Sequence, residues 1–155
     1  MLGELLTRNA QNNPDKTALK AGTLEVTYRE LEMHSQAVAQ ALLELGLQPG
    51  DRVALHLLNG IETAVSYFAC FRAGLIAVPC NLQLKAEEIA FALENSQART
   101  YVVTQTLSDL IQAVRLRLPA VERIVQVDQK PGENESIDES YDFGGLPMSR
   151  DRKSL

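Results

Sequence analysis

The sequence predicts an α/β fold, with a largely parallel sheet of βαβ units and helices on both faces. The first observation is the stretch 51–79, where a short apolar run, 53–58, is followed by a segment of helical length and a second apolar run, 75–78. Two apolar strands joined by one helix are typical of a right-handed parallel βαβ unit. The second observation is that strand-like and helix-like segments continue to alternate afterwards, which predicts a three-layer arrangement.

The helix of this central unit is predicted from its two ends and its apolar stripe. Asn59 is expected to be the N-cap, with Glu62 three residues later, and Gly74 is expected to supply the left-handed residue that ends the helix. Four apolar residues at near-helical spacing are expected to face the sheet: Ile61, Val65, Phe68 and Ala69. The second strand is expected to be buried and to be closed by Pro79.

Two helices and a hairpin are predicted before the central unit. In chain order they are a helix over 2–12, strands over 17–20 and 24–26 around a turn at 21–23, and a helix from Thr27 to Gly46 whose stripe is Leu31, Val38, Leu42 and Leu45. Thr27 and Glu30 have the spacing of a capping box, in which each side chain accepts a hydrogen bond from the backbone amide of the other residue. A turn is expected at 48–51.

More helices and strands are predicted after the central unit. They are a helix over 85–95, a strand over 99–104, a helix opened by Thr106 and Asp109 and ended by Pro119, and a strand over 123–127. From Asp128 onward the sequence is rich in acidic residues, Pro, Gly and Ser and has no apolar period. We therefore predict a folded part over residues 1–127 and an acidic linker or disordered tail over residues 128–155.

Composition excludes several classes of protein. The 155 residues are 45% apolar, which is enough for a core, and a net charge of −5 without a large Lys and Arg cluster argues against nucleic-acid binding. The most apolar window, 61–78, contains two charged residues and a glycine, so no membrane span is expected. With no secretory signal and only two cysteines, Cys70 and Cys80, we expect reduced thiols and a cytoplasmic protein.

Four blocks of sequence follow one another over residues 26–90. They are Val26-Thr27-Tyr28-Arg29-Glu30-Leu31, then Leu45-Gly46-Leu47-Gln48-Pro49-Gly50-Asp51-Arg52-Val53-Ala54, then Phe71-Arg72-Ala73-Gly74-Leu75-Ile76-Ala77-Val78-Pro79, and Lys85-Ala86-Glu87-Glu88-Ile89-Ala90. In this order they resemble the start of the adenylate-forming ligases, the superfamily of acyl-CoA and aryl-CoA synthetases, peptide-synthetase adenylation domains and firefly luciferases. The resemblance covers roughly residues 4–127, which would be the N-terminal part of the AMP-dependent ligase domain.

This resemblance implies a reaction for the complete enzyme. Members of the superfamily activate a carboxylate with ATP and Mg²⁺, releasing pyrophosphate, and many then transfer the acyl group to coenzyme A or a pantetheine arm. The family's Ser/Thr/Gly-rich phosphate loop followed by Pro-Lys-Gly does not occur in these residues, and Gly144-Gly145 is an isolated pair. The family's usual Asn-Pro after the second strand is replaced by Pro79-Cys80. We therefore assign no catalytic, cofactor-binding or metal-binding residue, and expect ATP, Mg²⁺ and CoA or pantetheine only for the complete enzyme.

Several side chains have both a functional and a structural interpretation. His56 is either a base at a site or a hydrogen-bonded core histidine, and the core histidine is favoured because no acid or nucleophile lies near it in sequence. Asn59-Gly60 is more typical of a plain helix cap than of an anion site. Cys80 follows a strand end, where α/β sites lie, but lacks an activating base. His34 is expected at the surface, and the packing of Tyr28 over the hairpin is favoured over a contact of Tyr28 and Arg29 with a partner.

Two functional hypotheses follow. The first is the N-terminal fragment of an acyl-CoA synthetase-like AMP-forming ligase that is not catalytic alone. The second is a non-catalytic docking module that pairs with a full-length relative or a separately encoded catalytic half, or that associates with itself through an exposed sheet edge. An independent small-molecule-binding α/β protein is a third alternative that rests on the fold class alone. The sequence does not indicate which carboxylate the complete enzyme activates.

Overall fold

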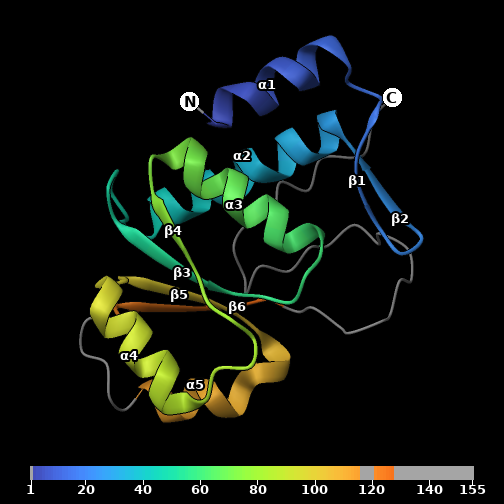
Figure 1. The fold of residues 1–155 in the computed structure, drawn as a ribbon. Coiled ribbons are helices and arrows are strands. Elements are labelled where there is room, and N and C mark those ends of the chain that lie inside the picture. The colour runs from blue at the N-terminus through green and yellow to red at the C-terminus, as the bar shows by residue number, and fades with distance from the viewer. Residues whose placement is uncertain (1, 116–120, 128–155) are drawn as a thin grey trace.

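Four parallel strands form the central sheet of this chain. The computed structural model describes residues 2–115 and 121–127, and the predicted tail over 128–155 and the predicted helix end at Pro119 lie outside them (Figure 1). The sheet has the order β4–β3–β5–β6. Its strands are β3 (Arg52–His56), β4 (Ile76–Pro79), β5 (Thr100–Thr104) and β6 (Arg123–Val127), so the predicted α/β fold with a parallel sheet is confirmed.

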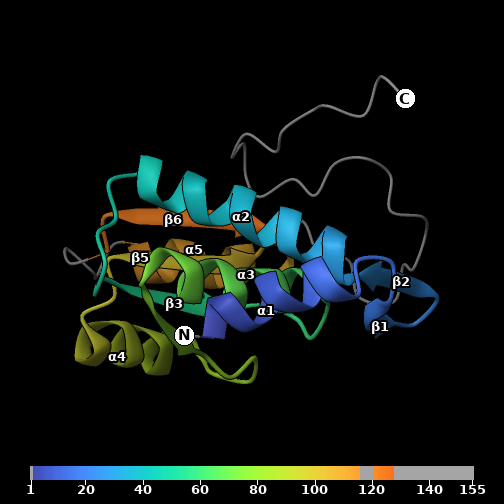
Figure 2. The same ribbon diagram turned by 90° about the horizontal axis from the view of Figure 1, so that it is seen from above.

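Helices cover both faces of this sheet, as predicted (Figure 1). One face carries α1 (Leu2–Asn12), α2 (Tyr28–Glu44) and α3 (Ile61–Ala73), and the other carries α4 (Ala86–Ser96) and α5 (Ser108–Arg115), which follows the short 3₁₀ turn η1 (Gln105–Leu107). Figure 2 shows α2 and α3 side by side over the sheet. No helix within residues 2–115 and 121–127 has the length and apolar character needed to cross a membrane.

Strand alternation divides the buried residues into two cores. Val53 and Leu55 of β3 point into the larger core under α1, α2 and α3, whereas Ala54 of the same strand points toward α4. The smaller core consists of Ala54, Ile89, Leu93, Ala98, Tyr101 and Val103. Each fully buried Val or Leu side chain contributes about 1.5–3 kcal/mol relative to exposure, so these two layers hold the sheet in place.

The N-terminal hairpin and the capping box are found where the sequence predicts them. Strands β1 (Thr17–Ala21) and β2 (Leu24–Thr27) pair antiparallel. The Glu30 amide donates to the Thr27 hydroxyl at 3.3 Å, and the Thr27 amide donates to the Glu30 carboxylate at 2.9 Å. Both bonds satisfy amides at the start of α2 that have no partner within the helix, and they fix where the helix begins.

Gly74 ends α3 in the left-handed conformation that the sequence predicts. Its φ is +69°, and its amide donates to the carbonyl of Cys70. A Cβ at this position would lie 3.2 Å from the Cβ of Pro49, so both the backbone angle and the available space favour glycine. The turn lets β4 start beside β3, where the Ile76 amide donates to the Asp51 carbonyl at 2.8 Å.

The predicted N-cap at Asn59 is wrong. Gly60 is the N-cap of α3, in an extended conformation and without a side-chain cap, and Asn59 is exposed. The reason lies in the preceding residue: the Leu58 amide donates to Thr104 Oγ1 at 3.1 Å, and the Thr63 hydroxyl donates to the Leu58 carbonyl. These bonds tie residue 58 to β5 and to the first turn of α3, so the helix starts one residue later than predicted.

The prediction that the second strand is buried is also wrong. Within the described sheet β4 pairs only with β3 and forms one edge, and Ile76 is 49% exposed. Ala77 and Val78 are half-buried, while Pro79 is exposed. Apolar composition alone gave no information on strand order, and an edge strand can be as apolar as a central one.

Candidate functional site

The carboxyl ends of β3 and β5 form the candidate site, because the connections diverge there. The segment after β3 leads to α3 on one face of the sheet, whereas the segment after β5 leads to α5 on the other face (Figure 1). Ligands of open α/β sheets bind outside the carboxyl ends of the strands at such a topological switch point. Polar residues near this point include His56 at the end of β3, Thr104 at the end of β5 and Cys80 just after β4. Tyr101 lies farther into the sheet, near the start of β5.

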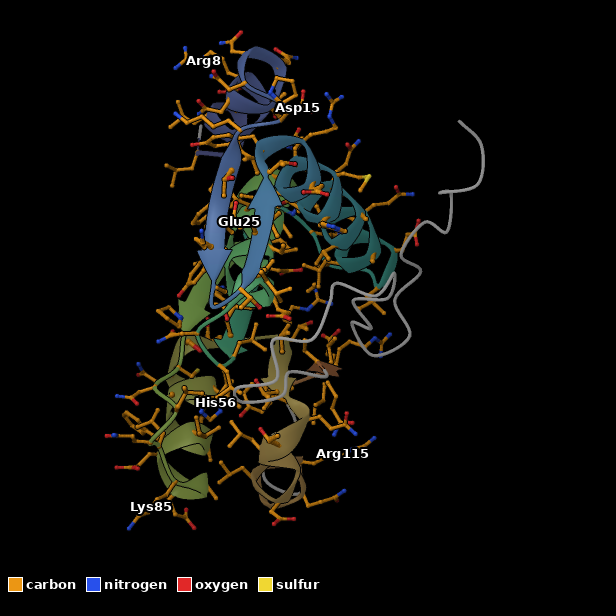
Figure 3. All side chains as sticks on the ribbon, turned by 90° about the vertical axis from the view of Figure 1, so that its right-hand side faces the viewer. Arg8, Asp15, Glu25, His56, Lys85 and Arg115 are labelled. Carbon is orange, nitrogen blue, oxygen red and sulfur yellow. The ribbon has the colours of Figure 1, made fainter. Side chains whose placement is uncertain are left out.

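His56 and Tyr101 form a buried pair on the α4 side of the sheet. Both side chains are 0% exposed, and His56 Nδ1 lies 2.6 Å from the Tyr101 hydroxyl. Figure 3 labels His56 inside the molecule, above the α4 and α5 layer, whereas Arg8, Asp15 and Arg115 lie on the outside. The interpretation of His56 as a hydrogen-bonded core histidine is therefore confirmed.

Burial sets the protonation of this pair. It lowers the pKa of His56, and the nearby backbone of Asn81 opposes this shift without reversing it. Burial also raises the pKa of Tyr101, with a further contribution from Cys80. Both groups are therefore neutral near pH 7, as expected for ionisable groups in an apolar setting. Nε2 of His56 is buried and has no hydrogen-bond partner among the described residues.

The two cysteines do not have the properties of nucleophiles. Burial raises the pKa of Cys80 to about 11 and that of Cys70 to about 12. A thiol must lose its proton to attack a substrate or bind a metal, so both groups are poorly reactive near neutral pH. Both cysteines are free of disulfides, in agreement with the expected reduced state.

A charged cluster holds the opposite, amino end of the sheet. Arg99, just before β5, contacts Asp51 at 2.5 Å between Nη1 and Oδ2 and binds Glu122 through two bonds of 3.0 and 2.7 Å. Asp51 also accepts a 2.8 Å bond from the Gln48 amide, which is the main reason that its pKa is lowered. The cluster links residues that precede β3, β5 and β6, so its role is to hold strands together.

The structure describes a small cavity on one face of the sheet. A cavity of about 10 Å³ lies between α2, α3 and the sheet, roughly the space for a single water molecule. Its walls are mostly apolar, and the hydroxyl of Ser66 is already bound to the Glu62 carbonyl. Residues 2–115 and 121–127 contain no group of three or more His, Cys, Asp or Glu side chains that could hold a metal ion.

Part of this arrangement can be predicted from the sequence, and part cannot. The sequence points to His56 and Cys80 as candidates, and the structure brings both near Tyr101, to which the sequence does not point. Asn59 lies exposed at the surface, whereas His56 is buried. Tyr101 and Arg99 carry no local signal, because their partners lie 45 and 48 residues away in sequence. Only a correct strand order would have placed these residues side by side.

Known proteins resemble this chain in both sequence and fold. A family model described as "AMP-binding enzyme" matches residues 6–150. Feruloyl-CoA synthase from Amycolatopsis sp is 34% identical over 134 residues, which are 84% of this chain and 27% of that protein. A 3-oxocholest-4-en-26-oate–CoA ligase from Rhodococcus rhodochrous is 30% identical over 115 residues, which are 74% of this chain and 21% of that protein.

Solved structures of CoA ligases have the same arrangement of strands and helices. An anthranilate CoA ligase, determined in complex with anthranoyl-AMP, has a TM-score of 0.77 and 35% identity over 80% of this chain and 24% of its own. The fatty acyl CoA synthetase of Mycobacterium tuberculosis has a TM-score of 0.77 and 26% identity over 81% of this chain and 26% of its own.

The chain belongs to the AMP-binding enzyme family, the adenylate-forming ligases, and it corresponds to an N-terminal region of acyl- and aryl-CoA ligases. It spans about a quarter of the length of the CoA ligases compared above. The expected superfamily is thereby confirmed.

Proposed function

We propose that this chain is the N-terminal part of an AMP-forming acid–thiol ligase and supplies scaffold to it, without catalysing the reaction alone. The complete enzyme would use ATP and Mg²⁺ to form an acyl-adenylate and would transfer the acyl group to CoA or a pantetheine carrier. The observation that carries this proposal is the family match over residues 6–150 together with a coverage of only 27% of feruloyl-CoA synthase.

The chemistry of the described side chains supports a scaffolding role. His56 and Tyr101 are neutral and pair with each other, and the pKa values of both cysteines lie far above neutral pH. The phosphate loop that the family resemblance implies is not among the 155 residues. On this proposal, residues 1–127 form one part of the ligase domain, residues 128–155 form a linker or tail, and the protein acts in the cytoplasm.

A second candidate is a non-catalytic docking module that pairs with a relative or with a separately encoded catalytic part. The observation that favours it is the open edge of β6, which ends the described sheet on one side. A strand with an unpaired edge is a ready template for another strand.

Carboxylate-dependent exchange of pyrophosphate into ATP tests both candidates. The chain is assayed alone and together with the remaining C-terminal part of Amycolatopsis feruloyl-CoA synthase, produced as a separate polypeptide, with ferulate, benzoate and a long-chain fatty acid as substrates. The first proposal predicts no exchange by either polypeptide alone and exchange by the mixture. Binding of the two polypeptides without exchange supports the docking module instead. Exchange by the chain alone contradicts both.

A further inference from the structure

The two edges of the sheet differ in the backbone groups that they present. β4 and β6 are the outer strands of the described sheet. In a parallel ladder, the N–H and C=O of one residue point to the same neighbouring strand, and those of the next residue point to the opposite side. The hydrogen bonds that each outer strand makes with its inner neighbour therefore determine which of its residues face outward.

The outward side of β4 lacks a donor. The Ile76 amide donates to Asp51 at 2.8 Å and the Cys80 amide donates to Leu55 at 2.9 Å, so alternate residues from 76 to 80 face β3. Ala77 and Pro79 then face outward. Proline has no N–H, so this edge offers a single donor within β4 and is a poor template for another strand.

The outward side of β6 keeps its donors. The Arg123 amide donates to the Arg99 carbonyl at 3.2 Å, and the parallel register pairs Arg123 with Thr100. Val125 and Val127 therefore face β5, while Ile124 and Gln126 face outward, each with an N–H and a C=O. β6 contains neither proline nor lysine, the residues that commonly protect an edge.

The side chains of β6 already have the pattern of an inner strand. Val125 and Val127 are buried in the larger core, and Ile124 packs against the smaller core on the other face. An added strand would therefore continue a sheet that has helical layers on both sides. Because the chain places β3, β5 and β6 in sequence order across the sheet, a further βα unit of the same hand would lie beyond β6.

We propose that the outer edge of β6 binds a parallel strand from the part of the ligase fold that this chain does not contain. The proposal rests on the proposed function, in which the chain is one part of a larger ligase domain. The occupant is supported by the coverage of only 27% of feruloyl-CoA synthase and by the outward amides of Ile124 and Gln126. Because Pro79 leaves the β4 edge with a single outward donor, an added strand would pair with β6 instead of β4.

Amide hydrogen exchange of the full chain gives the first test. In the chain alone, the amides of Ile124 and Gln126 should exchange faster than those of Val125 and Val127. Addition of the remaining C-terminal part of Amycolatopsis feruloyl-CoA synthase should slow the two outward amides. Slow exchange that depends on protein concentration would identify a second copy as the occupant, and slow exchange that is lost on removing residues 128–155 would identify the chain's own tail. Either outcome overturns the proposal.

Proline variants give the second test. Gln126→Pro removes one outward donor of β6 and leaves the amides that face β5 intact, so capture of the added polypeptide should weaken roughly tenfold or more. Ala77→Pro makes the matched change at the β4 edge and should not alter capture, and Gln126→Ala controls for the side chain. Equal effects of the two proline variants, or no capture by the unmodified chain, overturn the proposal. If Gln126→Pro does not fold, the exchange experiment on the unmodified chain decides.

The two proposals fail in different ways. Capture that depends on Gln126, but without carboxylate-dependent exchange of pyrophosphate, supports the strand-binding edge and contradicts the proposed catalytic partnership. Exchange of pyrophosphate by the mixture that Gln126→Pro does not affect supports the catalytic partnership and contradicts the strand-binding edge.

Discussion

The two ends of the same sheet are stabilised by opposite means. At the amino end, Arg99 joins two carboxylates that are partly open to solvent. At the carboxyl end of β3, His56 is fully buried, neutral and bound to the buried hydroxyl of Tyr101, which reaches it from the neighbouring strand β5. A partly exposed ion cluster is screened by water and salt, whereas a buried polar pair cannot exchange its partner for water. The carboxyl end should therefore tolerate substitution much less than the amino end.

The largest expected effect is that of removing the Tyr101 ring. Tyr101→Ala should lower the free energy of unfolding by about 3–5 kcal/mol, because it opens a cavity in the smaller core and leaves Nδ1 of His56 unpaired. Tyr101→Phe keeps the ring and should cost about 1–2 kcal/mol. Urea denaturation measures both. Equal losses for the two variants would contradict a role for the hydroxyl bond, and negligible losses would break the contrast between the two ends.

Backbone geometry is expected to matter more than charge at the amino end. Gly74→Ala should destabilise the chain by about 1–2 kcal/mol, because an L residue is strained at a φ of +69°. Gly46→Ala is a matched control, since Gly46 has a φ of +90° and a Cβ added there would meet no atom within 4 Å. Thermal unfolding of both variants separates the cost of the backbone angle from that of the contact with Pro49. A larger loss for Gly74→Ala than for Gly46→Ala would show a cost from the contact with Pro49, because the backbone angle of Gly46 is the less favourable of the two for an L residue. No measurable loss in either variant would contradict the expected cost of the backbone angle.

The two ends should also lose stability in different pH ranges. The folded-state pKa of His56 is lowered from 6.5, so the unfolded chain binds more protons below that pH and stability should fall as the pH drops below 6.5. The pKa values of Asp51 and Glu122 are lowered from 3.8 and 4.5, so their contribution should be lost only at lower pH.

Urea denaturation between pH 7.5 and 5 measures the contribution of His56. His56→Leu removes the titrating group and should flatten the dependence of stability on pH over this range, whatever its effect on absolute stability. The same slope in the unmodified chain and in His56→Leu would show that other groups cause the loss.

The smallest expected effect is that of removing the charge of Arg99. Arg99→Met keeps part of the aliphatic stem and should destabilise the chain less than Tyr101→Phe does, because the ion pairs are partly exposed. The difference between Arg99→Met and the unmodified chain should shrink as salt is added. A loss as large as that of Tyr101→Ala, or one that is insensitive to salt, would reverse the comparison between the two ends.

Local chemistry was sufficient to predict most helices and strands. The capping box of Thr27 and Glu30 and the left-handed end at Gly74 depend on residues a few positions apart, so they can be identified without knowledge of the fold. The strand over residues 123–127 and the parallel α/β class also followed from apolar runs and their alternation with helices. The protonation and pairing of His56 could not be predicted in detail, because Tyr101 lies 45 residues away.

By itself, the sequence determined the α/β class, the capping box that starts α2, the glycine that ends α3 and the superfamily, because these depend on short-range patterns that do not require knowledge of the strand order. Only the tertiary structure decided that β4 is an edge, that Leu58 is bound by Thr104 and α3 therefore starts after Gly60, and that Arg99 reaches Asp51. It also decided which amides of β6 face outward. Strand order and register fix these features, since they bring together residues that are distant in sequence.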